Sequence, residues 1–123
     1  MRYMMLIYSR EEERLPEELS AVAAAHRAVL DETGGRGILL AADPLQPSST
    51  ATVLRIENGK VMVTDGPFAE TKEQLAGYYI LDCENLDEAL AWAAKIPTAC
   101  NGAAGCIEIR PLREMRRSLL TNE

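Results

Sequence analysis

Three short segments of this chain are apolar at consecutive positions, and this pattern limits the fold more than any other feature. The segments are Met4–Ile7, Ile38–Ala41 and Tyr79–Leu81. A strand that faces water on one side alternates apolar and polar residues, whereas consecutive apolar residues are typical of strands buried on both faces. The sequence therefore predicts a β-sheet that needs cover above and below.

Two helices are predicted, and each has recognisable ends. The first begins at Pro16, because proline lacks the amide proton that the first helical turn leaves unpaired, and it stops at the glycine pair 34–35. The second begins at Asn85 and ends before Pro97, since asparagine followed by Glu88 three residues later is a helix-start signature. Two helices can cover one face of a sheet, so the other face stays open.

An Asn-Gly pair at 58–59, between segments 50–56 and 61–64, predicts a β-hairpin because both residues tolerate positive φ. Further strands are expected at 3–8, 38–42, 78–81 and 107–109. The resulting order predicts an α+β fold, a ferredoxin-like βαβ-βαβ with an inserted hairpin. We expect a homodimer, in which a second copy covers the open face; the alternative is a hairpin that folds back as a lid within one chain.

The composition narrows the class of protein. A length of 123 residues suits one domain, which we place at 1–112, followed by a C-terminal tail at 113–123. The net charge of −6 argues against nucleic acid or an anionic membrane as a partner, because both recruit clustered cations. No apolar run is long enough to span a bilayer, and three cysteines without metal spacing suit a reducing cytoplasm.

No cofactor and no metal are expected. The sequence lacks the phosphate-binding loop, the dinucleotide fingerprint and the nucleophile-elbow motif. Its only histidine, His26, has no clustered companions, so it makes a poor metal site. Cys100 and Cys106 flank a glycine-containing loop without a neighbouring cation or base, and we expect no reactive role for their thiols.

The least ordinary stretch is Thr64–Tyr79, where a carboxylate, a glycine, a proline and the only phenylalanine are adjacent. Asp65, Gly66 and Pro67 are typical of a tight turn, in which Asp65 accepts a backbone amide and Phe68 fills the core. A functional interpretation stands beside this one. The rigid turn would hold the Asp65 carboxylate at a cleft, where Gly66 lets the backbone pass close to a neighbour.

His26 falls on the apolar stripe of the first helix, which should face the sheet. One interpretation is a core histidine hydrogen-bonded to a backbone carbonyl. The other is a catalytic pair, in which His26 moves a proton and Asp65 orients it or acts itself. The two interpretations predict different geometries, because a catalytic pair requires the side chains of His26 and Asp65 close together in one cleft.

The residues after the turn are also candidates. Glu70, Lys72 and Glu73 form a solvated helical turn in one interpretation, and in the other Lys72 binds an anionic or polar ligand. Tyr78 and Tyr79 point to opposite faces of their strand, so one belongs to the core and the other can meet a ligand or a partner chain. The expected ligand-binding residues are Gly66, Phe68, Lys72 and Tyr78.

The stretch VTDGPFAETKEQL at 63–75, which runs into Gly77-Tyr78-Tyr79, resembles the signature of YCII-related proteins of the DGPF type. Segments 45–47, 87–89 and 107–111 also fit, so the resemblance covers residues 1–112. It implies a bacterial protein with the ferredoxin-like fold of a dimeric α/β barrel, in which two sheets pack face to face.

The resemblance also bears on function. In relatives of the shorter YCII type, a histidine on the first helix and an aspartate are a proposed catalytic pair; His26 stands at that place, and Asp65 is the acid that the DGPF motif offers. Members are often encoded near alternative sigma factors, which implies a regulatory setting.

Two functions are therefore expected. The first is a cytoplasmic homodimer that binds a small polar organic molecule between the first helix, the sheet and the turn. Cofactor-free proton transfer by His26 and Asp65 is the chemistry that such a cleft would support, with Tyr78 or Lys72 steadying negative charge. The second is a non-catalytic regulatory or ligand-sensing module.

Overall fold

The computed structural model describes residues 1–11, 15–97 and 105–115. Its main sheet has four strands in the spatial order β2-β5-β1-β6, and a separate two-stranded hairpin consists of β3 and β4. In chain order the elements are β1 (Arg2–Arg10), α1 (Pro16–Gly35), β2 (Leu39–Pro44), the 3-10 helix η1 (Ser48–Thr50), β3 (Thr52–Glu57), β4 (Lys60–Asp65), β5 (Glu73–Asp82), α2 (Leu86–Ala93) and β6 (Gly105–Pro111). The predicted order of elements and the α+β class are confirmed.

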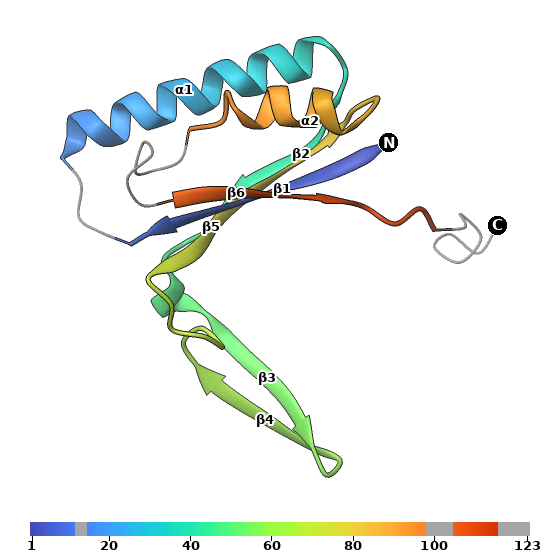
Figure 1. Cartoon of the computed structure of the whole chain (residues 1–123). Coiled ribbons are helices and arrows are strands. Elements are labelled where there is room, and N and C mark those ends of the chain that lie inside the picture. Colours follow the sequence, from blue (N-terminus) through green and yellow to red (C-terminus); the bar gives the residue numbers. More distant parts are fainter. Residues whose placement is uncertain (12–14, 98–104, 116–123) are drawn as a thin grey trace.

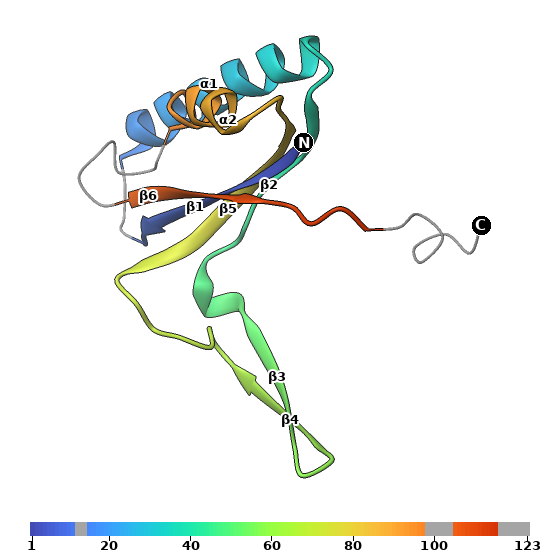
Figure 2. The same ribbon diagram turned by 45° about the vertical axis from the view of Figure 1, so that its right-hand side comes forward.

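Both α-helices of the described chain lie on one face of the main sheet. Figure 1 shows α1 and α2 side by side above the strands, and Figure 2 shows the same layering from another direction. β1 is central and pairs antiparallel with β5 on one side and β6 on the other, while β2 pairs with β5. Neither helix is both long and apolar enough to cross a bilayer.

The helix ends follow the local signals in the sequence. α1 begins at Pro16, as predicted, and runs to Gly35. At the start of α2 the Asn85 side chain accepts a 2.9 Å hydrogen bond from the Glu88 amide, and the Glu88 carboxylate accepts one from the Glu84 amide. The first bond satisfies an amide that a helix leaves unpaired in its first turn, and the second ties the residue before the cap to that turn.

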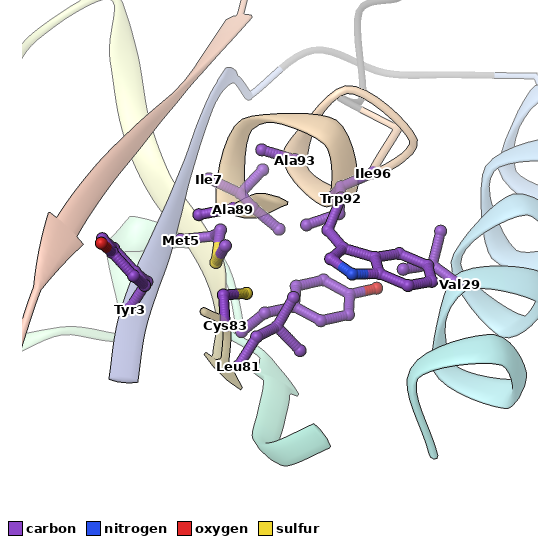
Figure 3. Close-up of a cluster of buried hydrophobic side chains, with 11 residues drawn as sticks. Tyr3, Met5, Ile7, Val29, Leu81, Cys83, Ala89, Trp92, Ala93 and Ile96 are labelled. Carbon is purple, nitrogen blue, oxygen red and sulfur yellow. The ribbon is translucent and has the colours of Figure 1, made fainter. Parts of the chain in front are cut away.

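The hydrophobic core lies between the sheet and the helices (Figure 3). In this view the Trp92 side chain of α2 extends toward Val29 of α1. Arg36 and Lys95 lie over the Trp92 ring, 5.3 and 4.8 Å from its centroid. The buried hydrophobic residues are Tyr3, Met5, Ile7, Val29, Tyr79, Leu81, Cys83, Ala89, Trp92, Ala93 and Ile96. Each large apolar side chain buried here stabilises the fold by about 1.5–3 kcal/mol.

The second face of the sheet, called the open face below, is formed by alternate residues of the two central strands. Met4 lies opposite Ile80 and Leu6 opposite Tyr78 in the β1–β5 ladder. These four side chains are partly exposed, whereas their neighbours in both strands are buried under the helices. The open face therefore presents a contiguous apolar patch that no helix of the described chain covers.

The Asn-Gly hairpin forms as predicted, with φ of 51° at Asn58 and 76° at Gly59. It extends away from the main sheet, on the side opposite the helices (Figures 1 and 2). Every described residue of β3 and β4 except Val53 is exposed. The alternative of a lid folded over the open face of the same chain is therefore wrong.

β5 is longer than predicted, because it begins at Glu73 rather than at Tyr78. Its first residues pair with the end of β1, where Glu73 lies opposite Arg10. The helical turn expected at Glu70, Lys72 and Glu73 is thus wrong, since Glu73 lies in the strand and the other two precede it. Ladder hydrogen bonds with β1 outweigh the polar character of this segment.

Candidate functional site

The segment Asp65–Phe68, called the DGPF turn below, closes the hairpin at its base. Asp65 is the last residue of β4 and lies opposite Thr52 at the start of β3. The Gly66 amide donates a 2.7 Å hydrogen bond to the Ala51 carbonyl. Gly66 has a φ of 91°, a left-handed conformation that favours glycine. The turn therefore holds the Asp65 carboxylate on an anchored backbone.

A cleft of about 530 Å³ lies beside the DGPF turn. Its charged groups are three carboxylates and one ammonium group, and most of its other polar groups are hydroxyls and a carboxamide. The lining residues are Glu11, Ser48, Ser49, Asp65, Gly66, Pro67, Glu70, Thr71, Lys72 and Gln74. The cleft thus joins the end of β1, the 3-10 helix, the turn and the segment before β5.

One of the three carboxylates is already engaged. Glu11 accepts a 2.7 Å hydrogen bond from the Ser48 amide and a 2.9 Å bond from the Ser48 hydroxyl, which fixes η1 against the end of β1. Asp65, by contrast, has no hydrogen-bond or ion-pair partner among the residues that the structure describes. A charged acceptor on a rigid turn is therefore free for a ligand.

The far wall of the cleft is the segment 69–74, and Gln74 holds it in shape. The Gln74 carboxamide donates hydrogen bonds of 3.0 Å to the Ala69 carbonyl and 3.1 Å to the Thr71 carbonyl. Lys72 lies within this segment and is exposed. Its ammonium group forms no ion pair with any residue in the described ranges, so it too is available to a ligand.

The structure brings Asp65, Gly66 and Lys72 of the predicted site to this cleft and leaves the other three, Phe68, Tyr78 and His26, outside it. Phe68 is 79% exposed, so it does not fill the core as the tight-turn interpretation expected. Tyr78 lies on the open face, where its hydroxyl donates a 2.9 Å hydrogen bond to Asp43 of β2. That hydrogen bond to a carboxylate raises the pKa of Tyr78.

His26 lies on α1, across the sheet from the DGPF turn (Figure 1). Its Nδ1 is 2.7 Å from the Tyr79 hydroxyl, and the two rings stack with centroids 5.9 Å apart. Burial lowers the pKa of His26 and raises the pKa of Tyr79 to about 12, because a low-dielectric environment disfavours both charged forms. The expected hydrogen bond from His26 to a backbone carbonyl is wrong, and one chain does not bring His26 and Asp65 into one cleft.

Comparison with known proteins decides the family. The model of the YCII-related domain matches residues 1–116. The chain belongs to the YCII-related family. An uncharacterised protein of Rhizobium meliloti (strain 1021) is 44% identical over 102 residues, which are 83% of this chain and 76% of the relative.

The backbone of one solved structure also resembles that of this YCII-related protein. That structure is 5-chloro-2-hydroxyhydroquinone dehydrochlorinase from Burkholderia phenoliruptrix AC1100 in complex with 2,5-dihydroxybenzoquinone. The match has a TM-score of 0.46 and 17% sequence identity, and covers 91% of this chain and 95% of that one.

A second depression of about 730 Å³ adjoins the cleft of the YCII-related chain and shares Thr71 and Lys72 with it. The Tyr8 hydroxyl in its wall donates a 3.4 Å hydrogen bond to Glu108. Burial and the Glu108 carboxylate raise the pKa of Tyr8. The other lining residues are Arg10, Glu73, Cys106, Ile107 and Glu108.

The described segments hold no cluster of three or more His, Cys, Asp or Glu side chains that could bind a metal ion. Among the described cysteines Cys83 is buried and Cys106 is exposed, and Cys100 lies outside the described residues. Sequence reasoning missed Glu11, Ser48 and the pairing of Tyr79 with His26. Neither contact has a local signal, because 37 and 53 residues separate the partners.

Proposed function

We propose that this YCII-related protein is a homodimeric binding protein that takes up a small polar organic molecule in the cleft beside the DGPF turn. The observation that carries the proposal is the Asp65 carboxylate, which is held on an anchored turn and has no partner among the described side chains or backbone groups. A fixed charged acceptor with unused hydrogen-bonding capacity is suited to recognising a donor group of a ligand.

The charges of the cleft favour one class of ligand. Glu11, Asp65 and Glu70 contribute three negative charges against one positive charge from Lys72. An anion entering this cleft would meet like charges, whereas an amine or a hydroxyl group finds carboxylate acceptors. The ligand is therefore a small molecule that carries an amine and further hydroxyl or carbonyl groups, with Lys72 and Gln74 as donors to the latter.

The binding function is preferred to catalysis by a His26–Asp65 pair. His26 belongs to α1 and Asp65 ends β4, and Figure 1 shows these two elements on opposite sides of the main sheet. His26 is also engaged with Tyr79. A general base must lie within hydrogen-bond reach of the proton that it removes, directly or through one water. Of the two residues only Asp65 lies at the cleft. The ligand-binding or sensing role requires only the geometry described above.

The homodimer would pack two open faces against each other, as in a dimeric α/β barrel with the ferredoxin-like fold. The patch of Met4, Leu6, Tyr78 and Ile80 supports it, since the described helices cover the opposite face of the sheet. Each 100 Å² of apolar surface left in water costs roughly 2.5 kcal/mol. A second copy removes this cost for both chains at once.

The ligand class is tested by calorimetric titration and thermal shift with three matched panels: small primary amines, polyols and carboxylates. We expect amines to bind and to raise the melting temperature, because a ligand that binds the folded state stabilises it. Asp65→Asn should weaken amine binding by about 10- to 100-fold, the effect of losing a charge-assisted hydrogen bond.

The matched control is Asp31→Asn, which removes the same charge from the exposed surface of α1. It should leave amine binding unchanged. Binding of carboxylates in preference to amines, or amine binding that Asp65→Asn leaves intact, would show that the proposed ligand class is wrong.

A further inference from the structure

The β3–β4 hairpin has one face that is apolar beyond the Thr52–Asp65 pair at its base, and one face, called the polar hairpin face below, on which most side chains are charged or polar. Leu54 lies opposite Val63 and Ile56 opposite Val61, so these four side chains share a face, called the apolar hairpin face below. They are 59% to 69% exposed. The other face carries Val53, Arg55, Glu57, Lys60, Met62 and Thr64.

The described part of the chain does not cover the apolar hairpin face. Both ribbon views show the hairpin extended away from the main sheet, on the side that the helices do not occupy (Figures 1 and 2). A two-stranded hairpin alone is marginally stable in water, because it lacks a second layer to pack against. A contiguous exposed apolar patch marks an interaction surface.

The exposed apolar side chains of the described residues extend beyond the apolar hairpin face. Phe68, at the base of the hairpin, is 79% exposed, and Met4, Leu6 and Ile80 of the open face are partly exposed. A standard protein interface buries about 800 Å² on each partner. The four side chains of the apolar hairpin face, which are about two-thirds exposed, supply less than this area, so a stable dimer needs the open face and the apolar hairpin face together.

We propose that the apolar hairpin face packs against a second copy of this chain, so that each subunit of the dimer clasps the other with its β3–β4 hairpin. The inference rests on the homodimer of the proposed function and adds the segment that completes its interface. The hairpin lies on the same side of the sheet as the open face, so a copy seated on that face lies beside the hairpin (Figure 1).

The second copy fits this surface better than an unrelated protein does. Each chain carries both the open face and the apolar hairpin face. In a dimer with a two-fold axis, both surfaces of one subunit can therefore contact the other subunit. Arg55, Glu57 and Lys60 on the polar hairpin face remain in water in such an arrangement. The DGPF turn, at the base of the hairpin, then lies at the boundary between subunits, and the ligand cleft depends on the dimer for its shape.

Sedimentation equilibrium of matched double variants of β3 tests the inference. Leu54→Ser with Ile56→Ser polarises the apolar hairpin face, and Arg55→Ser with Glu57→Ser makes the same change on the polar face of the same strand. We expect the first pair to raise the dimer Kd by about 100-fold or more, because two large apolar side chains per subunit lose their burial. The second pair should leave the Kd within about threefold of the wild-type value.

A second measurement avoids the risk that the serine variant disturbs folding. Ile56→benzoylphenylalanine places a photoreactive group on the apolar hairpin face, and isotopically light and heavy proteins are mixed before illumination. We expect cross-linked peptides that join a light chain to a heavy chain. If the wild-type protein is a dimer, but no light-to-heavy peptides form and Leu54→Ser with Ile56→Ser leaves the dimer Kd unchanged, the clasp is wrong and the homodimer stands. A wild-type monomer at micromolar concentration overturns both proposals.

Discussion

The Tyr79 hydroxyl lies 2.7 Å from Nδ1 of His26, and this contact joins the centre of β5 to the middle of α1. Tyr79 is 3% exposed, and its ring stacks on the imidazole with an interplanar angle of 18°. No residue in the first half of α1 is buried, and only Val22 there is partly buried, so the helix depends on contacts of this kind to stay on the sheet. His26 thus has a structural role that its position on the helical stripe only partly indicates.

Tyr79→Phe should lower the free energy of unfolding by about 1–2 kcal/mol, since it deletes a hydrogen bond and leaves the half-buried Nδ1 of His26 without its partner. Urea unfolding at neutral pH measures the change. Thr50→Val is the control, because it removes a hydroxyl group from an exposed hydrogen bond to the Pro47 carbonyl, away from the open face. The control should cost less than about 0.5 kcal/mol. Equal costs for the two variants would contradict the assigned role.

Acid should weaken the fold through His26. Burial lowers the pKa of the folded imidazole below its usual value of about 6.5. As the pH falls below that value, the unfolded chain therefore binds a proton before the folded chain does, and stability is lost. Above it both states are neutral and His26 contributes no pH dependence.

His26→Gln isolates this contribution from that of the carboxylates. The stability advantage of the wild-type protein over His26→Gln should shrink as the pH is lowered from about 7 to about 5, and urea unfolding at several pH values measures it. An advantage that stays constant or grows in acid would mean that the folded imidazole takes up its proton as readily as the unfolded one.

Most of the fold could be predicted because its signals are local. Pro16 and Asn85 begin the helices, and the Asn58–Gly59 turn forms where the sequence indicates it. The start of β5 was missed because Glu73 and its neighbours are polar, and only the ladder with β1 explains why they are extended. Strand boundaries of this type depend on the partner strand, which the local sequence does not contain.

The candidate site was predictable only in part. The DGPF turn could be found because an aspartate, a glycine and a proline in succession restrict the backbone strongly. The contact of Glu11 with Ser48 could not be found, because it joins the end of β1 to a 3-10 helix 37 residues later. The position of His26 was identified correctly as a helix face toward the sheet, but that face does not meet Asp65 in one chain.

Gly77→Ala should destabilise the protein by about 1–3 kcal/mol, the usual cost of overpacking a filled site. A Cβ at Gly77 would lie 2.9 Å from the Asp43 carbonyl oxygen and 3.2 Å from the Pro44 Cα, and these backbone atoms of β2 cannot swing aside. Gly35→Ala is the matched control near the end of α1, where no heavy atom lies within 4 Å. It should be neutral or stabilising by up to about 1 kcal/mol, because alanine restricts the unfolded chain. Thermal unfolding of the two variants checks both signs.

Ile80→Lys should convert the protein to a monomer, because it places a charge at the centre of the open face. In one chain Ile80 is only partly buried, so a lysine there can extend its ammonium group into water at little cost to folding. In a face-to-face dimer the same group is enclosed by the partner sheet, where an unpaired charge is costly.

Leu90→Lys is the matched control on the exposed side of α2. Light scattering of both variants at micromolar concentration should return half the wild-type mass for Ile80→Lys and the wild-type mass for Leu90→Lys. Wild-type mass for Ile80→Lys, with circular dichroism showing a folded protein, would place the dimer interface elsewhere.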